Sequence, residues 1–306
     1  DIDYGKIKLY VGNYDFWYES SELLQKQIKD SNKKKEEKIK ELKDFIARFS
    51  ANASKSKQAT SRKKMLENIE LETLTPSSRK YPFIEFKMNE PHGKEILTVG
   101  KLTKKIGDKV ILDKVSFNVM QGDKINIICD DDTKKTALFN ILMGIDKDYT
   151  GQVIWGKTMK PSYLPQDNTN YFNDKEKNIM DWIGDFYDIK DETVLRGFLG
   201  RMLFSKDDVF KKVGVLSGGE KARCMLSKMM LENPNFLILD EPTNHLDLES
   251  ITSLNKALEN FTGEIIFTSR DHELNSTVGN RIIKIDENGK ITDRYLSYDE
   301  FLEKEN

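Results

Sequence analysis

The sequence predicts an α/β fold that is preceded by a pair of α-helices. From about residue 22 to residue 80 the chain is rich in Lys and Glu and contains no glycine. After residue 80, predicted strands and helices alternate. The short apolar runs at 236–240 and 263–269 have the length and composition of buried parallel strands. With 306 residues, the chain can form one large domain or two ordinary ones.

Residues 22–80 contain a helical apolar stripe. Leu42, Ile46 and Phe49 recur at spacings of four and three residues, as on one face of a helix. The small and polar stretch at 50–61 interrupts this pattern before it resumes. We interpret the segment as two antiparallel helices that are joined at a tip of small residues.

The same segment carries most of the positive charge. Residues 26–80 contain sixteen Lys and Arg against eight Asp and Glu, whereas the whole chain has a net charge of −2. Five cations gather at the predicted tip: Lys55, Lys57, Arg62, Lys63 and Lys64. Two interpretations stay open. The helices form an ordinary solvated hairpin, or the tip contacts nucleic-acid phosphates without reading sequence.

The downstream domain is predicted to begin with strands. A Pro–Ser turn and a first strand are expected within residues 75–86. Further strands are expected at 95–106, 109–120 and 124–129, which give the domain an antiparallel β start. Helices are expected at 136–143, 176–187, 192–203 and 219–232. This order favours an α/β domain over separate α and β domains.

The two ends of the chain resemble each other. Residues 2–21 and residues 285–304 both read Ile-Asp, a turn glycine, Lys-Ile, a short strand, and then Tyr-Asp at the start of a charged helix. Self-similarity of this kind indicates a repeated unit. We interpret residues 1–21 as the tail of an upstream copy of the downstream domain; a chance resemblance is the alternative.

Composition excludes two classes of protein. Two cysteines, Cys129 and Cys224, are too few for a disulfide framework in a chain of this size. The apolar runs are far shorter than the 18 or more residues that a membrane helix requires. The expectation is a cytoplasmic protein with no membrane partner.

Residues 127–144, IICDDDTKKTALFNILMG, lie between a predicted strand and a predicted helix. Lys135 and Thr136 stand where the phosphate-loop pattern G-x-x-x-x-G-K-[ST] has its Lys and Ser or Thr. The pattern's glycines are absent, and Cys129, Asp132 and Lys134 take the three glycine positions. The loop therefore has the position of a phosphate loop without its usual backbone freedom.

The three consecutive aspartates allow two interpretations. A carboxylate about 5 Å from a phosphate charge would repel it by roughly 3 kcal/mol at an effective dielectric near 20, although Lys134 and Lys135 return some attraction. Alternatively, the aspartates cap the helix and occupy its anion-binding end themselves. The first interpretation gives a weakened nucleotide site, and the second gives a structural loop.

The second motif is LSGGEKARCMLSKMMLENPNFLILDEPTNHLD, residues 216–247. Its apolar strand delivers Asp240 and Glu241 to the carboxyl end, where ligands bind in open α/β sheets. Asp240 could hold Mg²⁺, and Glu241 could orient or deprotonate an attacking water. Upstream, Gly218 and Gly219 follow Ser217 at a helix start, whose N–H groups can meet an anion.

This second motif resembles the signature motif, Walker B strand and D-loop of ATP-binding-cassette (ABC) ATPases, and DEPTNHLD resembles the soluble ABC-F group. The resemblance implies an α/β, P-loop NTPase-type ABC cassette with an antiparallel β subdomain and a helical signature subdomain, preceded by an α-helical hairpin linker. Its implied parts are the tail of an upstream cassette at 1–21, the linker at 22–80 and a second cassette at 81–306.

The resemblance also implies ATP and Mg²⁺ as cofactors, with Glu241 as the catalytic residue. The implied metal-binding residues are Thr136, Gln166 and Asp240. The implied ATP-binding residues are Lys134, Lys135, Thr136, Gln166, Ser217, Gly218, Gly219 and Arg270. Besides the phosphate loop, two positions depart from the family pattern: Ile106 stands where an adenine-stacking aromatic is usual, and Arg270 stands at the switch-histidine position.

In this family each ATP lies between the Walker motifs of one cassette and the signature of the other. The implied partners are therefore the upstream cassette and, through the linker tip, the RNA of the ribosome. One hypothesis is a working ATPase half of a translation factor with a degenerate Walker A loop. The alternative is a catalytically inactive half, which donates LSGGE to the partner cassette and binds RNA through its linker.

Overall fold

The computed structural model describes residues 2–3, 6–7, 9–12, 14–49, 56–67, 69, 79–88, 93–187, 191–205 and 207–305. The chain divides into two compact units, residues 1–79 and residues 80–306. Among the described residues, no helix is both long and apolar enough to cross a membrane.

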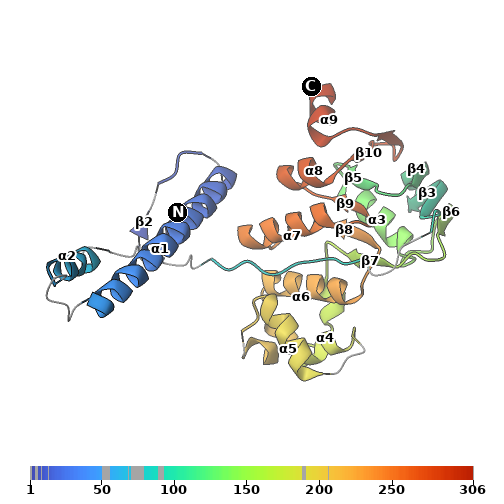
Figure 1. Cartoon of the computed structure of the whole chain (residues 1–306). Helices are drawn as coiled ribbons and strands as arrows, with labels where there is room; N and C mark the ends of the chain where they lie inside the picture. The colour runs from blue at the N-terminus through green and yellow to red at the C-terminus, as the bar shows by residue number, and fades with distance from the viewer. Residues whose placement is uncertain are drawn as a thin grey trace. The chain divides into compact units, whose positions relative to one another are not determined.

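The first unit is a two-stranded hairpin followed by two helices (Figure 1). Its elements are β1 (Ile2–Asp3), β2 (Lys6–Ile7), α1 (Tyr14–Phe49) and α2 (Ser56–Glu67). The two helices contact each other, and Leu42 of the predicted stripe is buried. The tip was predicted at residues 50–61, but α2 already begins at Ser56, so part of the predicted tip is helical. Residues 50–55 lie outside the described residues.

The second unit begins with an extended segment. Ile84 and Phe86 are buried in its hydrophobic core, and the Phe86 ring packs edge-on against Phe261. The N–H of Phe83 donates to the carbonyl of Arg201, 2.9 Å away, at the end of a helix. The strand expected here is wrong, because the alternating burial arises against helices and not within a sheet.

A three-stranded antiparallel sheet follows, in the order β4-β3-β6. Its strands are β3 (Leu97–Ile106), β4 (Lys109–Val119) and β6 (Thr150–Trp155). Alternate residues of β3 and β4 are buried, which leaves the other face of this sheet in water.

The second sheet has six strands in the order β11-β10-β5-β9-β8-β7. All neighbouring strands are parallel except the edge strand β11. The strands are β5 (Lys124–Ile128), β7 (Pro161–Leu164), β8 (Phe236–Asp240), β9 (Glu264–Thr268), β10 (Arg281–Ile285) and β11 (Ile291–Arg294). Every residue of β8 and β9 is buried, as expected for parallel strands covered on both faces.

The helices of this unit flank the sheet or pack on helices that do (Figure 1). They are α3 (Asp132–Leu142), α4 (Ile179–Gly184), α5 (Glu192–Arg201), α6 (Gly218–Leu231), α7 (Leu248–Asn260), α8 (His272–Val278) and α9 (Tyr298–Glu305). Three short 3₁₀ turns complete the unit: Thr169–Phe172, Asp208–Phe210 and Val213–Val215. Helix α3 contacts both sheets through β4 and β8, and α4 contacts α5 and α6. The predicted α/β fold class is confirmed.

The similar ends of the chain adopt the same local structure. In β1–β2 the paired residues are Ile2 and Ile7, and in β10–β11 they are Ile285 and Ile291. Each hairpin leads to a helix that begins at a Tyr-Asp pair, α1 at residue 14 and α9 at residue 298. The sequence repeat is therefore also a repeat of strand register and helix start.

Candidate functional site

The phosphate loop and the Asp240-Glu241 pair meet at one edge of the six-stranded sheet. Strands β5, β9 and β8 are parallel neighbours, so their carboxyl ends lie together. A cavity of about 260 Å³ opens at this edge. Its lining includes Asp132, Lys135, Glu241, Arg270 and Tyr298. The fold thus brings together residues that are far apart in the sequence.

Lys135 is already paired inside this cavity. Its ammonium nitrogen lies 2.7 Å from Oδ1 of Asp132 and 3.2 Å from Oε1 of Glu241. The lysine is only 5% exposed. Burial lowers the pKa of Lys135, but Asp132 and Glu241 raise it by more, so it lies above its usual value. The cation that a phosphate would need is held by two of the chain's own carboxylates.

Arg270 holds the other oxygen of Asp132. Its Nη2 lies 3.1 Å from Oδ2 of Asp132, and its backbone N–H donates to Oε2 of Glu241 at 3.1 Å. The hydrogen bond from Lys135 lowers the pKa of Asp132, burial opposes this, and the charges of Lys135 and Arg270 lower it further. Asp132 therefore bridges two cations, as a bound anion would.

The three aspartates of the loop have different roles. Asp131 is the N-cap of α3, and its Oδ1 accepts a hydrogen bond of 2.9 Å from the N–H of Thr133. Asp130 lines the cavity. Of the three aspartates, only Asp132 forms an ion pair with Lys135. Helix capping and anion pairing, which the sequence offered as one explanation, are thus divided between two neighbouring residues.

Lys134 points away from the cavity. It is 3% exposed, and its ammonium donates to the carbonyl oxygens of Asp286 and Glu287, both 2.8 Å away. These carbonyls belong to the turn between β10 and β11. The structure therefore does not bring Lys134 together with Lys135, although the sequence pattern grouped them as phosphate contacts.

The predicted metal ligands lie beside the phosphate loop, in which Lys135 is paired with Asp132 and Glu241. The hydroxyl of Thr136 donates to Oδ2 of Asp240 at 2.8 Å, and the hydroxyl of Thr268 donates to Oδ1 at 3.0 Å. Burial raises the pKa of Asp240, and these two hydrogen bonds partly counteract it. Gln166 and Thr136 both line an adjoining cavity of about 400 Å³.

Glu241 has an unusual backbone conformation. Its φ is +52°, in the left-handed region that favours glycine. The conformation is held by its N–H, which lies 3.0 Å from Oγ1 of Thr268. This places the carboxylate, 3% exposed, against Lys135. Such local strain is typical of functional sites.

The oxygen atoms of Thr136, Gln166 and Asp240 are suitable ligands for Mg²⁺. The phosphate loop, in contrast, does not fit a triphosphate while Asp132 is paired with Lys135. Hydroxyl, carboxylate and amide oxygens are the ligands that Mg²⁺ prefers. In the part of the chain that the structure describes, no cluster of three or more His, Cys, Asp or Glu could hold a metal alone. Phosphate oxygens or water would have to complete the coordination shell of the Mg²⁺ ion. The lysine that would hold the phosphate, Lys135, is already paired with Asp132.

The signature helix α6 begins differently. Ser217 is its N-cap, and a capping box with Glu220 satisfies two backbone N–H groups. Gly218 and Gly219 follow at the first two helical positions, where N–H groups have no acceptor within the helix. Lys211 lies 3.2 Å from Glu220 and fixes the carboxylate of the capping box. Ser217 and Gly218 are exposed, and none of these residues lines the Lys135 cavity.

The structure explains why the signature contains two glycines. A Cβ at position 218 would lie 3.1 Å from the ring of His245, and one at 219 would lie 2.9 Å from the carbonyl oxygen of His245. The turn after Glu241 therefore packs directly against the start of α6. A Cβ at position 219 would force the backbone of the turn away from α6, whereas a Cβ at position 218 would require the His245 ring to shift.

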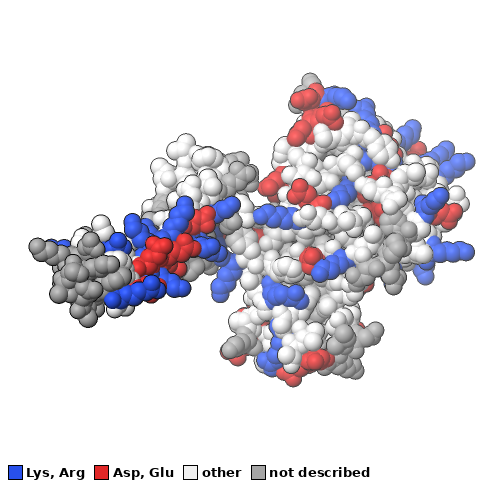
Figure 2. All heavy atoms as spheres, viewed as in Figure 1, with Lys and Arg blue, Asp and Glu red and all other residues white. Residues whose placement is uncertain are grey.

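The linker cations are only partly described. Arg62, Lys63 and Lys64 are exposed on α2, and the guanidinium of Arg62 lies 3.9 Å from the centre of the Phe45 ring. Lys57 lies within α2, and Lys55 lies outside the described residues. Figure 2 shows basic and acidic side chains intermixed along α1.

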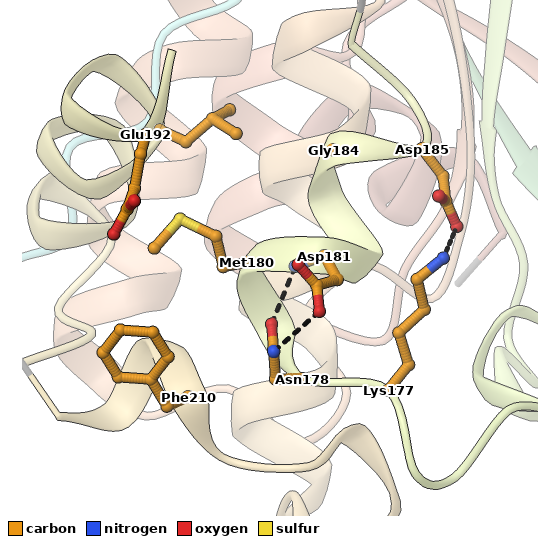
Figure 3. A pocket seen from close by; sticks show the side chains of 9 residues that line it. Lys177, Asn178, Met180, Asp181, Gly184, Asp185, Glu192 and Phe210 are labelled. Carbon is orange, nitrogen blue, oxygen red and sulfur yellow. Dashed lines mark hydrogen bonds and ion pairs between the residues drawn. The ribbon is translucent and has the colours of Figure 1, made fainter. Parts of the chain in front are cut away.

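A separate cavity of about 450 Å³ lies in the helical subdomain, between α4, α5 and Phe210 (Figure 3). Its charged groups are largely satisfied locally: Lys177 pairs with Asp185, and Glu192 pairs with Arg196. None of the residues that the sequence singled out lines this cavity. It is distinct from the nucleotide-site candidate.

Sequence reasoning missed three residues of the site. Thr268, which orders Asp240 and Glu241, was detectable as a polar residue at the end of a buried strand. Tyr298, which enters the cavity wall from α9, had no local signal of a role in the site; His245 lies within the motif at 216–247, but its contact with the start of α6 is a tertiary one. Ile106, at the expected adenine position, ends β3 with 52% of its surface exposed.

Known proteins resemble the chain along its whole length. Residues 1–86 and residues 112–244 match two family models, both described as ABC transporter. The chain is 54% identical to an uncharacterised ABC transporter ATP-binding protein, YkpA, of Bacillus subtilis, over 99% of this chain and 56% of that protein. It is 38% identical to the probable ATP-binding protein YbiT of Escherichia coli O157:H7, over 99% and 57%.

A plant relative and a solved structure extend this comparison. ABC transporter F family member 2 of Arabidopsis thaliana is 33% identical over 99% of this chain and 45% of that protein. The chain thus spans about half the length of the curated relatives it matches. A dimeric ATP-binding cassette, MJ0796, bound to ADP and Pi, matches with a TM-score of 0.54 and 19% identity, over 66% of this chain and 99% of that one. At this identity the likeness shows the fold alone.

Proposed function

This chain belongs to the ABC transporter family through its ATP-binding cassette, and we propose that it is one half of a two-cassette, ABC-F-type ATPase. In this proposal its signature helix completes the nucleotide site of an upstream cassette. Its own phosphate loop is degenerate and contributes little or no hydrolysis. The relatives' greater length supports a second cassette, as does the hairpin register that residues 2–7 share with residues 285–291.

The contrast between the two motifs carries the proposal. The start of α6 is exposed and has two N–H groups without intrahelical acceptors. In the phosphate loop, Lys135 is buried and is neutralised by Asp132 and Glu241. The signature motif is therefore available to a ligand on another cassette, whereas the phosphate loop has its own anion.

At the partner's site, ATP would supply the phosphate and the reacting bond. This chain's contribution is to bind and orient. The N–H groups of Gly218 and Gly219 are hydrogen-bond donors at the positive end of α6, whereas the hydroxyl of Ser217 already donates to Oε2 of Glu220 at 2.8 Å. Glu220, which is fixed by Lys211, holds this helix start in shape.

The proposed site of action is the ribosome, with the helical linker as the RNA-contacting part. Exposed Lys63 and Lys64 on α2, and the net charge of +8 over residues 26–80, support contact with backbone phosphates. Replacing both lysines with Glu should weaken co-sedimentation with ribosomes and reduce its salt dependence. Unchanged co-sedimentation at every salt concentration would count against the linker as the RNA contact.

The signature role is tested by ATPase assays of the full two-cassette protein. Gly218→Asp places a negative charge at the anion-binding end of α6 and should reduce turnover by about a hundredfold or more. Gly218→Ala is the matched control, since it adds the same Cβ, which lies 3.1 Å from the His245 ring, without the charge. Equal turnover in the two variants would remove the proposed role.

A second variant distinguishes this proposal from a working ATPase half. Glu241→Gln removes the carboxylate that would act on water in this chain's own site. If this half is inactive, adding Glu241→Gln to the corresponding substitution in the upstream cassette should not increase the fraction of protein that is trapped on ribosomes. Additional trapping would show that this half hydrolyses ATP.

A further inference from the structure

We propose that Asp132 is a built-in competitor for phosphate, which makes this loop discriminate against nucleoside triphosphates. Its carboxylate occupies the anion position between Lys135 and Arg270. The inference rests on the proposed function in one respect, that the loop descends from a nucleotide site. It goes further by naming the residue that sets the loop's ligand preference.

The geometry around Asp132 matches that of a bound anion. Each carboxylate oxygen is held by a different cation: Oδ1 by Lys135 at 2.7 Å and Oδ2 by Arg270 at 3.1 Å. Asp132 and Lys135 lie one turn apart on α3, so the pair forms without any change in the fold. A phosphate would have to displace a carboxylate that is tethered next to its own cation.

Glu241 completes the charge balance of the cluster. Two carboxylates, Asp132 and Glu241, face two cations, Lys135 and Arg270, so the four groups sum to zero. Adding phosphate while Asp132 stays in place would give the cluster a net negative charge in a partly buried site. Attraction at short range is strong there, and so is repulsion.

Asp132 is nevertheless able to move. Its side chain is 41% exposed, and Arg270 is 74% exposed, whereas Lys135 and Glu241 are 6% and 2% exposed. The two exposed groups can rotate into water without opening the core. The buried pair would remain and could receive an anion once the carboxylate is gone. The block is therefore local to one side chain.

The other two aspartates do not form this block. Asp131 is the cap of α3 and bonds to the N–H of Thr133. Asp131→Asn is a matched control, because Asn is an equally good N-cap and the variant removes the same unit of charge from the same loop. Any difference between Asp132→Asn and Asp131→Asn then reports position and not net charge.

The test is calorimetric titration of Mg·ATP into the chain and its two variants. Asp132→Asn should bind Mg·ATP at least about tenfold tighter than the millimolar limit up to which the native chain shows no binding at this loop, because the variant frees Lys135 and removes a repulsive charge. Asp131→Asn should show no such gain. No gain in Asp132→Asn, or an equal gain in both variants, would overturn the inference.

A second readout does not depend on nucleotide. Without ATP, Asp132→Asn should lower the midpoint of thermal unfolding more than Asp131→Asn, because it leaves Lys135 and Arg270 without their shared anion. Adding Mg·ATP should raise the midpoint of Asp132→Asn alone. The opposite order of the two midpoints without ATP would also overturn the inference.

The two proposals fail separately. If Gly218→Asp leaves the turnover of the full protein intact while Asp132→Asn gains affinity, the signature role is wrong and the inference about Asp132 stands. If Gly218→Asp abolishes turnover while Asp132→Asn gains nothing, the inference is wrong and the signature role stands.

Discussion

Two helix starts in the same cassette face the same physical problem and solve it differently. The N-termini of α3 and α6 both carry unpaired N–H groups and the positive end of a helix dipole. At α3 the chain supplies the anion, because Asp132 lies between Lys135 and Arg270. At α6 the capping box satisfies part of the helix start and leaves Gly218 and Gly219 open.

The difference shows what determines whether a helix start becomes a ligand site. Both starts have a capping side chain, Asp131 in one and Ser217 in the other. What differs is the next residue, which is Asp132 at α3 and Gly218 at α6. At α3 the carboxylate at this position pairs with Lys135, the cation that a bound anion would otherwise meet, and α6 has no carboxylate there.

The largest expected effect is the loss of unfolding free energy when Lys135 is removed from the phosphate loop. Lys135→Ala would leave Asp132 and Glu241 without their shared cation, and Glu241 is buried. The free energy of unfolding without nucleotide should fall by about 3 kcal/mol, as when one partner of a buried ion pair is removed. Urea denaturation measures this, with exposed Lys105→Ala as the control.

An open phosphate loop would behave in the opposite way. There the lysine faces no carboxylate, and its removal would leave stability unchanged. A loss in Lys135→Ala no larger than in Lys105→Ala would therefore break the comparison between the two helix starts.

The next effect concerns the signature helix. Ser217→Ala should cost about 1 kcal/mol of stability, because it removes the side chain that caps α6. Ser217→Thr should retain most of that stability, since Thr can form the same cap. Thermal or urea unfolding of the three proteins checks this, and equal losses in the Ala and Thr variants would contradict the capping role.

The acid side of the stability profile should depend on Asp132. Its pKa is lowered in the folded state, so it contributes stability above its unfolded value and loses that contribution as the pH falls. The difference in unfolding free energy between the native chain and Asp132→Asn should therefore shrink from about pH 5 downward. A difference that stays constant from neutral pH to about pH 3 would show that the ion pairs of Asp132 do not stabilise the fold.

The smallest effect is expected from Arg270→Ala. The guanidinium pairs with Asp132 from the surface, and its side chain is 74% exposed. Exposed ion pairs contribute about 0.2–1 kcal/mol, so the variant should lose only a few tenths. High salt should erase the difference between Arg270→Ala and the native chain. A loss that persists in high salt would indicate a role other than this pair.

Much of the fold was predictable because its signals are local. The apolar run at 236–240 became the buried strand β8, and the motif Ser217 to Glu220 became a capping box. The Asp cap of α3 was also foreseen as one explanation for the aspartate run, and Asp131 fills that role.

Choices of partner in three dimensions were not predictable. Adjacent Lys134 and Lys135 look equivalent in the sequence, yet one donates to the β10–β11 turn and the other to Asp132 and Glu241. The run from Phe83 to Phe86 has the apolar and aromatic composition of a strand, but its buried residues Ile84 and Phe86 pack against helices. The partners of Lys134 and Lys135 differ because adjacent residues point to different sides of α3. The environment of Ile84 is set by tertiary packing.

The most direct test of the account is a titration of Mg·ATP into the native chain, with Lys135→Ala beside it at a temperature where both are folded. No binding heat that depends on Lys135 is expected up to millimolar ATP, because Asp132 and Glu241 already hold that ammonium. Micromolar binding that is lost in Lys135→Ala would show that the phosphate loop accepts ATP despite its aspartates, and would contradict the account.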